Sequence, residues 1–461
     1  MTERKLLQGG TVLGLGRADI LIEDGKITAI STDLAHADAE HIDVSGKLLM
    51  PGLIDTHRHT WQTLLRGLGC DWTVLDYLAA VRVKLAPAFS AEDVYLSNYA
   101  GALEALDCGV TTLVDHAHII NSPEHADAAW SGLQQAGVRA LFAYGFASND
   151  LPDAGHFTTH AARIEHARKW CTTHDSELVR AGVALSEMQI PWQDTCAELR
   201  CARELGLPIT FHCASWPVPG MSQVERLSVD GRLGPDMLLV HCTHCSDDDL
   251  RRIADSGASI SATPETELQM GMGFPIVGHA LRHGIRTTLG ADVVCSNNGD
   301  PFAMMRLALQ AERGAANARA GLPMRLELPA ARMLPMVTSD AAAAMGLGST
   351  VGTLREGMQA DIVLLSMHAL NLSPAPLQAA AVVTQAHAGN VEDVLVRGRF
   401  VKRHGKLLGV DLPALQHKLS THREALLDRV GGPDHLLSEL PMLLQHWNIG
   451  QAEVAAGTQS A

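Results

Sequence analysis

Residues 51 to 59 of the chain read Pro51-Gly52-Leu53-Ile54-Asp55-Thr56-His57-Arg58-His59. A brief apolar run ends here on two histidines that are separated by a single residue. Side chains two apart in an extended segment lie on the same face, so the imidazoles of His57 and His59 can both reach one metal ion. Catalytic groups at the carboxyl end of a strand are typical of parallel β/α barrels. The stretch therefore predicts the first strand of such a barrel.

Seven further apolar runs follow, each separated from the next by a longer stretch of helical character. This alternation is typical of βα units. Eight strands close a barrel, whereas an open doubly wound sheet, which is the alternative, needs no particular count. The eight predicted strands are Leu53–Asp55, Thr111–Asp115, Ala140–Gly145, Val183–Leu185, Pro208–Phe211, Met237–Val240, Ser259–Ala262 and Arg286–Gly290.

Strand-like sequence also flanks the predicted barrel on both sides. Near the start, Ile20–Ile22 and Ile27–Ile30 surround Asp24-Gly25, which is a signal for a tight hairpin turn. Beyond residue 345, Ala360–Leu365 and Val394–Val396 are again strand-like. Two such segments can pack together as one small sandwich.

The expected fold is therefore α/β, a (β/α)8 TIM-like barrel with a small β-sandwich domain built from both chain ends. Residues 1–51 and 345–410 are expected to form the two parts of the sandwich, and residues 52–344 the metal-dependent barrel. Residues 411–461 are expected to form a C-terminal tail that is helical up to about Trp447.

Composition narrows the class of protein. The length of 461 residues suits a barrel with an appended domain, and the formal net charge of −15 argues against nucleic acid and against an anionic membrane surface. Nine cysteines lack the spacing of a disulfide scaffold, and no apolar signal core or transmembrane run is visible, which indicates the cytoplasm. We expect a small-molecule substrate and, by default, a symmetric homo-oligomer.

Five of the eight predicted strands end on a candidate ligand or acid. His212 would supply a third nitrogen and Asp292 an oxygen, and the set leaves one coordination position open, as catalytic sites do. An ion there would lower the pKa of a water molecule towards neutrality. Asp292 could then accept a proton, and His241 could polarise the group under attack. The first of these five strands leads into His57 and His59. The second, fifth, sixth and eighth strands lead into Asp115-His116, His212, His241 and Asp292, respectively.

Other side chains are candidates for substrate contact or support. Trp61 and Gln62 follow the histidine pair and are expected to touch substrate, whereas Arg66 is expected to anchor the loop through a salt bridge. His116 is either a substrate contact or an orienting residue. The remaining candidates, His118, His125, His156, His160, His166 and His174, are interpreted as solvated.

The first stretch resembles the signature of the amidohydrolase superfamily. Leu64-Leu65-Arg66-Gly67 resembles its aminohydrolase and chlorohydrolase branch, which includes guanine, cytosine and S-adenosylhomocysteine deaminases and the triazine hydrolases. Three further motifs are similar to that branch, namely His241-Cys242-Thr243-His244, Gly290-Ala291-Asp292 with Ser296-Asn297-Asn298, and Gly352 through Val363.

This resemblance covers nearly the whole chain and implies one mononuclear divalent ion. Its ligands would be His57, His59, His212 and Asp292, with His241 as the catalytic histidine. Three imidazoles and a carboxylate suit zinc and iron alike, and we expect zinc before iron.

The chain departs from the branch at one decisive position. Deaminases of the branch carry a glutamate three residues after the fifth-strand histidine, and here that residue is Ser215. A hydroxyl does not shuttle protons near neutral pH as a carboxylate does. Either Glu187, after the fourth strand, or another residue at the mouth replaces the acid, or the reaction needs no ring protonation.

The predicted function is metal-dependent hydrolysis of a C–N bond in a small nitrogen heterocycle or a related amine or amide. The alternative is an amidase, carbamate hydrolase or dehalogenase of the triazine-hydrolase type. A catalytically silent scaffold is the alternative from another class, but loss of ligands would mark it, and all four are present.

Overall fold

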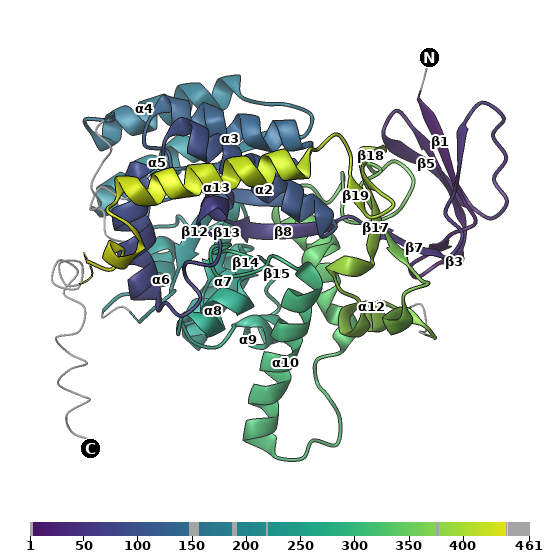
Figure 1. Ribbon diagram of the computed structural model, residues 1–461. Coiled ribbons are helices and arrows are strands. Elements are labelled where there is room, and N and C mark those ends of the chain that lie inside the picture. Colours follow the sequence, from purple (N-terminus) through teal and green to yellow (C-terminus); the bar gives the residue numbers. More distant parts are fainter. Residues whose placement is uncertain are drawn as a thin grey trace.

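The computed structural model describes residues 3–146, 156–186, 191–217, 220–374, 378–438 and 440. Its centre is an eight-stranded parallel sheet in which each strand pairs with the next along the chain. The predicted barrel is therefore confirmed (Figure 1). Its strands are β8 (Leu53–Arg58), β9 (Val110–Ala117), β10 (Arg139–Gly145), β11 (Val179–Ala184), β12 (Ile209–Cys213), β13 (Met237–His241), β14 (Ser259–Ala262) and β15 (Thr287–Leu289).

The barrel closes where the segment after β15 meets β8. The Asp292 N–H donates to the His57 carbonyl at 2.8 Å, and the His59 N–H donates to the Asp292 carbonyl at 3.2 Å. Gly290 permits this approach, because a Cβ atom there would lie 2.7 Å from both the nitrogen and the oxygen of the His57 backbone. Asp55 reinforces the seam by accepting the Ala291 N–H at 3.1 Å.

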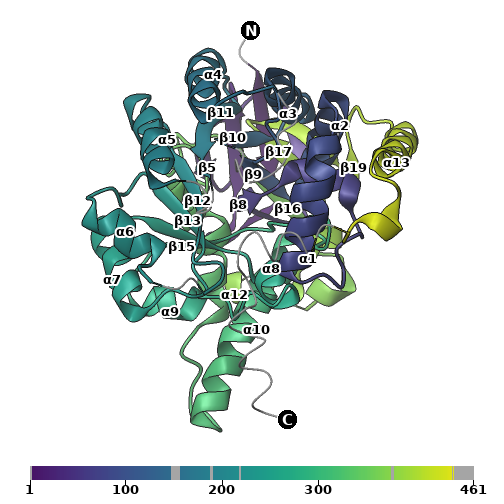
Figure 2. The same cartoon turned by 90° about the vertical axis from the view of Figure 1, so that its left-hand side faces the viewer.

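Helices surround the barrel and bury its outer face (Figure 2). Trp130 and Trp170, from two of these helices, pack edge to face with ring centroids 5.4 Å apart, and both contact Phe142 of β10. The helices between the strands are α1 (Val74–Tyr77), α2 (Ala91–Asp107), α3 (Pro123–Ala136), α4 (His160–Thr173), α5 (Trp192–Glu204), α6 (Gln223–Val229), α7 (Asp247–Ser256), α8 (Pro264–Gln269) and α9 (Val277–Arg282). They are followed by α10 (Pro301–Ala320), α11 (Ser339–Ala344), α12 (Ala379–Gln385) and α13 (Leu412–Arg429).

One end of the barrel is filled with apolar side chains. Ile54, Val114 and Leu238 point inward from three strands and form a separate buried cluster. Ala341 and Ala342 of α11 belong to the same cluster, so this helix packs against the interior of the barrel. The polar groups of the site lie at the other end, where the strands finish.

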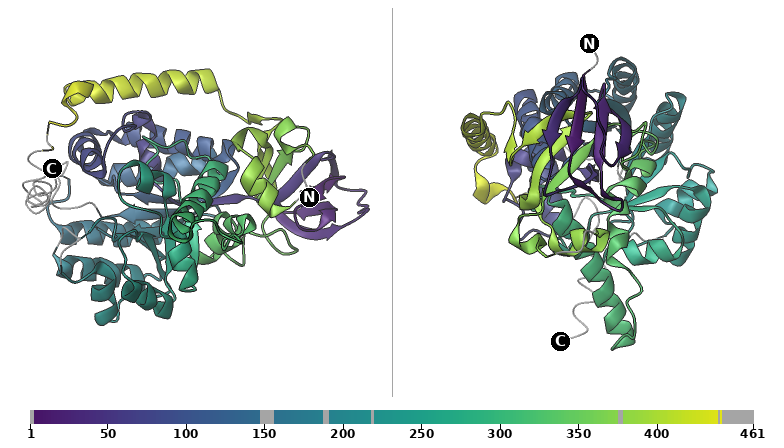
Figure 3. Two further views of the ribbon diagram at one scale, coloured as in Figure 1. Left: turned by 90° about the horizontal axis from the view of Figure 1, so that it is seen from below. Right: turned by 90° about the vertical axis from the view of Figure 1, so that its right-hand side faces the viewer.

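A small domain of two β-sheets contains both predicted sandwich segments (Figure 3). One sheet has the order β5-β4-β1-β6 and the other the order β19-β18-β17-β16-β7-β2-β3. Ile20 and Ile22 from the first pack against Ile362 and Leu395 from the second in one buried cluster. The strands are β1 (Arg4–Gln8), β2 (Thr11–Val12), β3 (Gly16–Arg17), β4 (Asp19–Glu23), β5 (Lys26–Ser31), β6 (Glu40–Asp43), β7 (Lys47–Pro51), β16 (Ile362–Ser366), β17 (Val391–Val396), β18 (Arg399–Arg403) and β19 (Lys406–Leu407).

This domain joins the barrel at the beginnings of the strands. β7 runs directly into β8, and Arg139, the first residue of β10, forms a buried ion pair with Asp361 at 2.8 Å. The predicted hairpin turn is confirmed, because Asp24 and Gly25 both have positive φ and connect the antiparallel strands β4 and β5. The carboxyl ends of the strands are therefore left free for a site.

The helix α13 lies outside the barrel beside α2. The Nδ1 atom of His422 lies 2.8 Å from an Asp93 oxygen, and Arg423 donates to the Arg66 carbonyl at 2.7 Å. The expected helix up to about Trp447 is interrupted, because α13 ends at Arg429 and only a short 3-10 helix, Pro433–His435, follows it; the rest of the prediction, from residue 441 on, lies outside the described residues. Among the helices that are described, none combines the length and apolar character needed to cross a bilayer.

The seam at Gly290 can be tested by adding one methyl group. Gly290→Ala should lower the free energy of unfolding by about 1–3 kcal/mol, because the new Cβ overlaps the His57 backbone. Gly314→Ala is the matched control, since no atom lies within 4 Å of its Cβ position in α10, and it should stabilise by about 0.5–1 kcal/mol. Urea unfolding of both variants measures the change in the free energy of unfolding. Equal changes in the two variants would contradict the close contact between Gly290 and the His57 backbone.

Candidate active site

Four side chains converge at the carboxyl end of the barrel. The Oδ1 atom of Asp292 lies 3.1 Å from Nε2 of His57 and 3.1 Å from Nε2 of His59. Nε2 of His212 lies 3.2 Å from Nε2 of His57. All four ligand atoms lie within 4.8 Å of one another. This is the set anticipated from the strand ends, and it is a donor set that suits a divalent metal ion.

Burial and hydrogen bonding prepare these groups to act as ligands. Burial holds the pKa of His57 well below its usual value, so the ring is neutral at pH 7. The Nδ1–H of His59 donates to the His116 carbonyl at 2.9 Å, which leaves the lone pair on Nε2. Burial opposes ionisation of Asp292, but its contacts with the imidazoles of His57 and His59 outweigh this effect and hold its pKa well below its usual value. The cluster therefore presents the neutral imidazole of His57 beside the carboxylate of Asp292.

The backbone is strained at several of these strand ends. Positive φ angles occur at Ala214 (47°), His241 (71°), Cys242 (58°) and Asp292 (60°), none of which is glycine. Such conformations cost of order 1–3 kcal/mol each and persist only where the surrounding structure enforces them. Here they turn the chain sharply after β12, β13 and β15, at the mouth of the barrel.

A buried network connects the proposed catalytic histidine with Asp292. Nδ1 of His241 lies 3.0 Å from the Thr263 hydroxyl and 3.4 Å from Glu267 Oε1. The Thr263 hydroxyl also lies 3.3 Å from Asp292 Oδ2. The backbone N–H of Thr263 donates to Glu267 Oε1 at 2.8 Å. His241 Nε2 is 4.0 Å from Asp292 Oδ2. Glu267 is fully buried and was not anticipated from the sequence.

A narrow cavity of about 40 Å³ opens beside three of the four candidate ligands, His59, His212 and Asp292. Ser215, which stands where the family resemblance predicts a glutamate, is one of the lining residues. Much of the remaining wall is apolar. The lining residues are His59, Val74, Tyr77, Leu78, His118, His212, Ser215, Trp216, His241, Thr266, Met270, Met272, Asp292 and Val293.

His118 belongs to this cavity, so its interpretation as a solvated residue was wrong. Its ring stacks on His59 with centroids 3.9 Å apart, and its side chain is buried. The Nε1–H of Trp61 donates to its Nδ1 atom at 2.9 Å, so in the neutral ring the proton resides on Nε2. His118 follows His116 by two residues, the same spacing that revealed His57 and His59. The same interpretation was wrong for His125 and His160. His125 is buried at 9% exposure, because it packs in α3 and bonds the Phe89 carbonyl. The side chain of His160 is 8% exposed and lies 2.9 Å from Glu198.

Trp61 and Gln62 do not line the cavity, although they were expected to contact substrate. Asp115 accepts the Thr60 N–H at 3.1 Å, and the chain after His59 turns inward as a 3-10 helix, Thr60–Leu65. Both side chains are fully buried. Trp61 supports His118, and Gln62 donates to the Tyr77 hydroxyl at 2.8 Å. They therefore support lining residues from behind.

His116 is also absent from the lining. It is buried, and its ring stacks on His212 with centroids 4.3 Å apart. Together with its carbonyl contact to His59, this favours the orienting role over substrate contact.

Comparisons with known proteins agree with this geometry. The profile of the amidohydrolase family matches residues 48–401. The chain belongs to the amidohydrolase family. It is 28% identical, over 85% of its length and 90% of the relative, to a 5-methylthioadenosine/S-adenosylhomocysteine deaminase of Acetivibrio thermocellus. It is 27% identical, over 90% of its length and 94% of the relative, to a 5'-deoxyadenosine deaminase of Methanosarcina mazei.

Solved structures show the same fold. An adenosine deaminase from Xanthomonas campestris with bound zinc has a TM-score of 0.81 and 23% identity, covering 91% of this chain and 98% of that one. An atrazine chlorohydrolase from Arthrobacter aurescens complexed with zinc has a TM-score of 0.80 and 22% identity, covering 91% and 99%. As an amidohydrolase with deaminase relatives, the protein is a hydrolytic enzyme that acts on carbon–nitrogen bonds.

Two other expectations concern the mouth of this amidohydrolase. Arg66 forms a salt bridge with Glu104 at 2.8 Å, so its predicted anchoring role is confirmed. Glu187, the expected replacement acid, lies outside the described residues. The neighbouring Ser186 is held by Glu198, which accepts its N–H at 2.9 Å. Within the described part of the chain, Glu267 is a buried carboxylate that lies beside His241.

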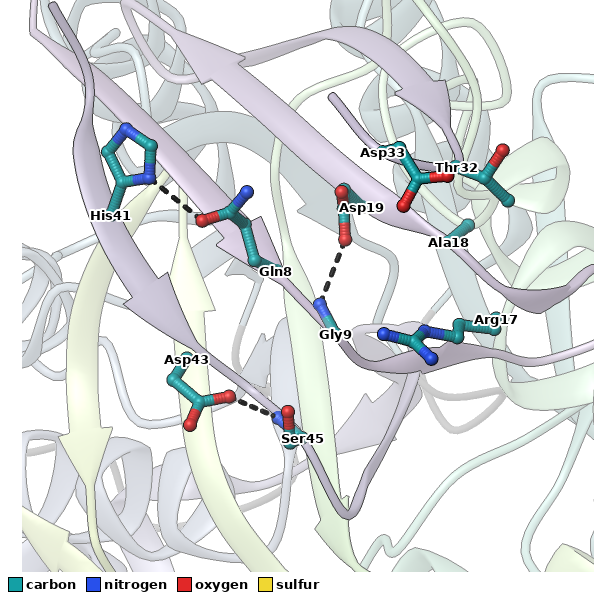
Figure 4. Close-up of a pocket in the computed structure, with 10 residues that line it drawn as sticks. All are labelled: Gln8, Gly9, Arg17, Ala18, Asp19, Thr32, Asp33, His41, Asp43 and Ser45. Carbon is teal, nitrogen blue, oxygen red and sulfur yellow. Dashed lines mark hydrogen bonds between the residues drawn. The ribbon is translucent and has the colours of Figure 1, made fainter. Parts of the chain in front are cut away.

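A larger cavity of the amidohydrolase, about 580 Å³, lies in the small domain and contains none of these residues (Figure 4). Its polar groups are used within the domain. Asp19 accepts the Gly9 N–H at 2.8 Å, and the side chains of His41 and Gln8 lie 2.8 Å apart. The candidate ligands His59, His212 and Asp292 line the smaller cavity at the mouth of the barrel, not this larger one.

Proposed function

We propose that this amidohydrolase binds one divalent ion, zinc in preference to iron, through His57, His59, His212 and Asp292. The proposal rests on the convergence of four ligand atoms within 4.8 Å of one another at the mouth of the barrel. Two imidazole nitrogens only 3.2 Å apart are well accommodated by a cation between them. The zinc in two structures of the same fold supports the choice of metal.

The ion would supply a water molecule acidified enough to attack at neutral pH. Asp292 is suited to accept the proton, because Oδ1 faces the imidazoles while Oδ2 lies towards Thr263 and His241. His241 would stabilise the charge that develops on the attacked group through its Nε2 atom. Glu267 and Thr263 would hold the His241 ring from the Nδ1 side.

The proposed substrate is a small, uncharged nitrogen heterocycle or a related amine or amide. Leu78, Trp216 and Met270 provide apolar surface, and the described lining contains no lysine, arginine or glutamate. His118 would donate a hydrogen bond to a substrate acceptor from Nε2, since Trp61 occupies its other nitrogen. The deaminases among the relatives support attack at a ring carbon that bears an amino group.

A second candidate is favoured by Ser215. The hydroxyl at this position cannot pass a proton to a ring nitrogen as a carboxylate would. Hydrolysis of an amide, a carbamate or a carbon–halogen bond does not depend on proton transfer to a ring nitrogen. We keep this as the alternative activity of the same metal site.

Metal removal tests the ligand set. The purified enzyme should hold about one tightly bound divalent ion, and chelation should lower its melting temperature. Restoring zinc at about 100 times its Kd should return about 2.7 kcal/mol of stability. Elemental analysis and thermal unfolding measure both effects. His212→Ala should lose both the bound metal and the stabilisation by zinc. His417→Ala, at an exposed position on α13, should retain both. Equal metal content in the two variants would contradict the proposed ligand set.

Replacing the proposed base should separate chemistry from metal binding. Asp292→Asn should lower kcat by about 10²–10⁴-fold on the best substrate found by screening, since the amide accepts no proton. His241→Ala should reduce kcat by about 10²–10³-fold while metal content stays at the wild-type level. Steady-state kinetics at matched metal occupancy provide the measurement. Turnover of Asp292→Asn within a few-fold of wild type would rule out the proton-transfer role.

Ser215 predicts which reactions the enzyme performs poorly. Wild type should show low activity on guanine, cytosine and adenosine-type compounds, and Ser215→Glu should raise it by restoring the carboxylate. Ser215→Gln has similar length without the acid and should not. The measurement is kcat/KM for ammonia release, compared with amide and halide substrates. Efficient wild-type deamination that neither variant alters would show that the proton takes another path.

A further inference from the structure

A second group of metal-ligating side chains lies on the outside of the barrel. His279 belongs to α9 and His283 follows the end of that helix, four residues later. Asp247 is the first residue of α7. Its Oδ1 atom lies 2.7 Å from His279 Nε2 and 3.4 Å from His283 Nε2, so one oxygen faces both rings. A ligand atom from each of the three lies within 4.8 Å of the others.

The local structure holds the three side chains towards one another. Residues four apart on a helix are neighbours on one face, which places the two imidazoles side by side, with ring centroids 5.3 Å apart. The start of α7 is capped by Ser246 and Asp249, which bond each other's backbone N–H groups. Asp247 is therefore not needed as a cap and extends across to α9. Figure 2 shows these two helices as neighbours.

We propose that Asp247, His279 and His283 form a second divalent-metal site, distinct from the catalytic one. Two imidazoles and one carboxylate suit Zn²⁺, Ni²⁺ or Cu²⁺, whereas Mg²⁺ and Ca²⁺ prefer oxygen ligands. Three protein ligands leave the other positions to water, and the side-chain exposures of 63% for Asp247 and 39% for His279 allow this. Such a site is weaker than the buried catalytic set.

A metal at this site would connect two helices that flank catalytic residues. α7 begins six residues after His241, the last residue of β13. α9 precedes β15 and Asp292, and α8 with Glu267 lies between α7 and α9 in the chain. An ion that holds α7 to α9 would therefore stabilise the part of the barrel that carries His241, Glu267 and Asp292.

The test uses the full-length enzyme with its catalytic site already loaded with zinc. Titration with further Zn²⁺ in a calorimeter should show one additional, weaker binding event and a rise in melting temperature. His279→Ala and His283→Ala should each weaken that event at least tenfold and abolish the rise. His417→Ala removes an exposed histidine from α13 and should behave as wild type.

The variants are expected to fold, because exposed ion pairs contribute little to stability. Circular dichroism and the content of tightly bound metal check this independently of the second site. The proposal is overturned if wild type binds no further Zn²⁺ up to millimolar concentration, or if both variants bind it as wild type does. Since the catalytic metal is measured separately, loss of the second event would leave the proposed function unaffected.

Discussion

The closure of the barrel between β8 and the segment after β15 is the constraint on which the site depends. Two backbone hydrogen bonds connect Asp292 with His57 and His59, and these bonds bring a carboxylate that follows the last strand beside two imidazoles at the end of the first. Gly290 allows the approach, and Asp55 holds it from the other side. The same bonds that complete the sheet therefore assemble three of the four proposed ligands.

A second layer of contacts determines how those side chains are presented. The His116 carbonyl selects the tautomer of His59, and Trp61 does the same for His118. On the opposite side, Thr263 bridges His241 and Asp292. Among the described residues, these contacts fix the orientation of the site's histidines without any substrate, so this part of the site is preorganised.

The sequence predicted the barrel and the four converging side chains because both follow from local patterns. Buried parallel strands appear as apolar runs, and the residue after each run must lie at the mouth. Glu267 was missed because it lies on a helix, and its contact with His241 depends on how that helix turns after β14. Trp61 and Gln62 were misplaced because strand spacing cannot anticipate the inward 3-10 turn that buries them. His118 could have been found, since it repeats the two-residue spacing of the metal pair.

We infer that three imidazoles and one carboxylate form a mononuclear metal site at this mouth. The most direct measurement is a crystal structure of the zinc-loaded enzyme with anomalous diffraction collected at the zinc edge. We expect the strongest anomalous peak about 2.0–2.2 Å from the Nε2 atoms of His57, His59 and His212 and from an oxygen of Asp292. A fully loaded crystal whose strongest peak lies elsewhere, with these four side chains bonded only to one another, would contradict it.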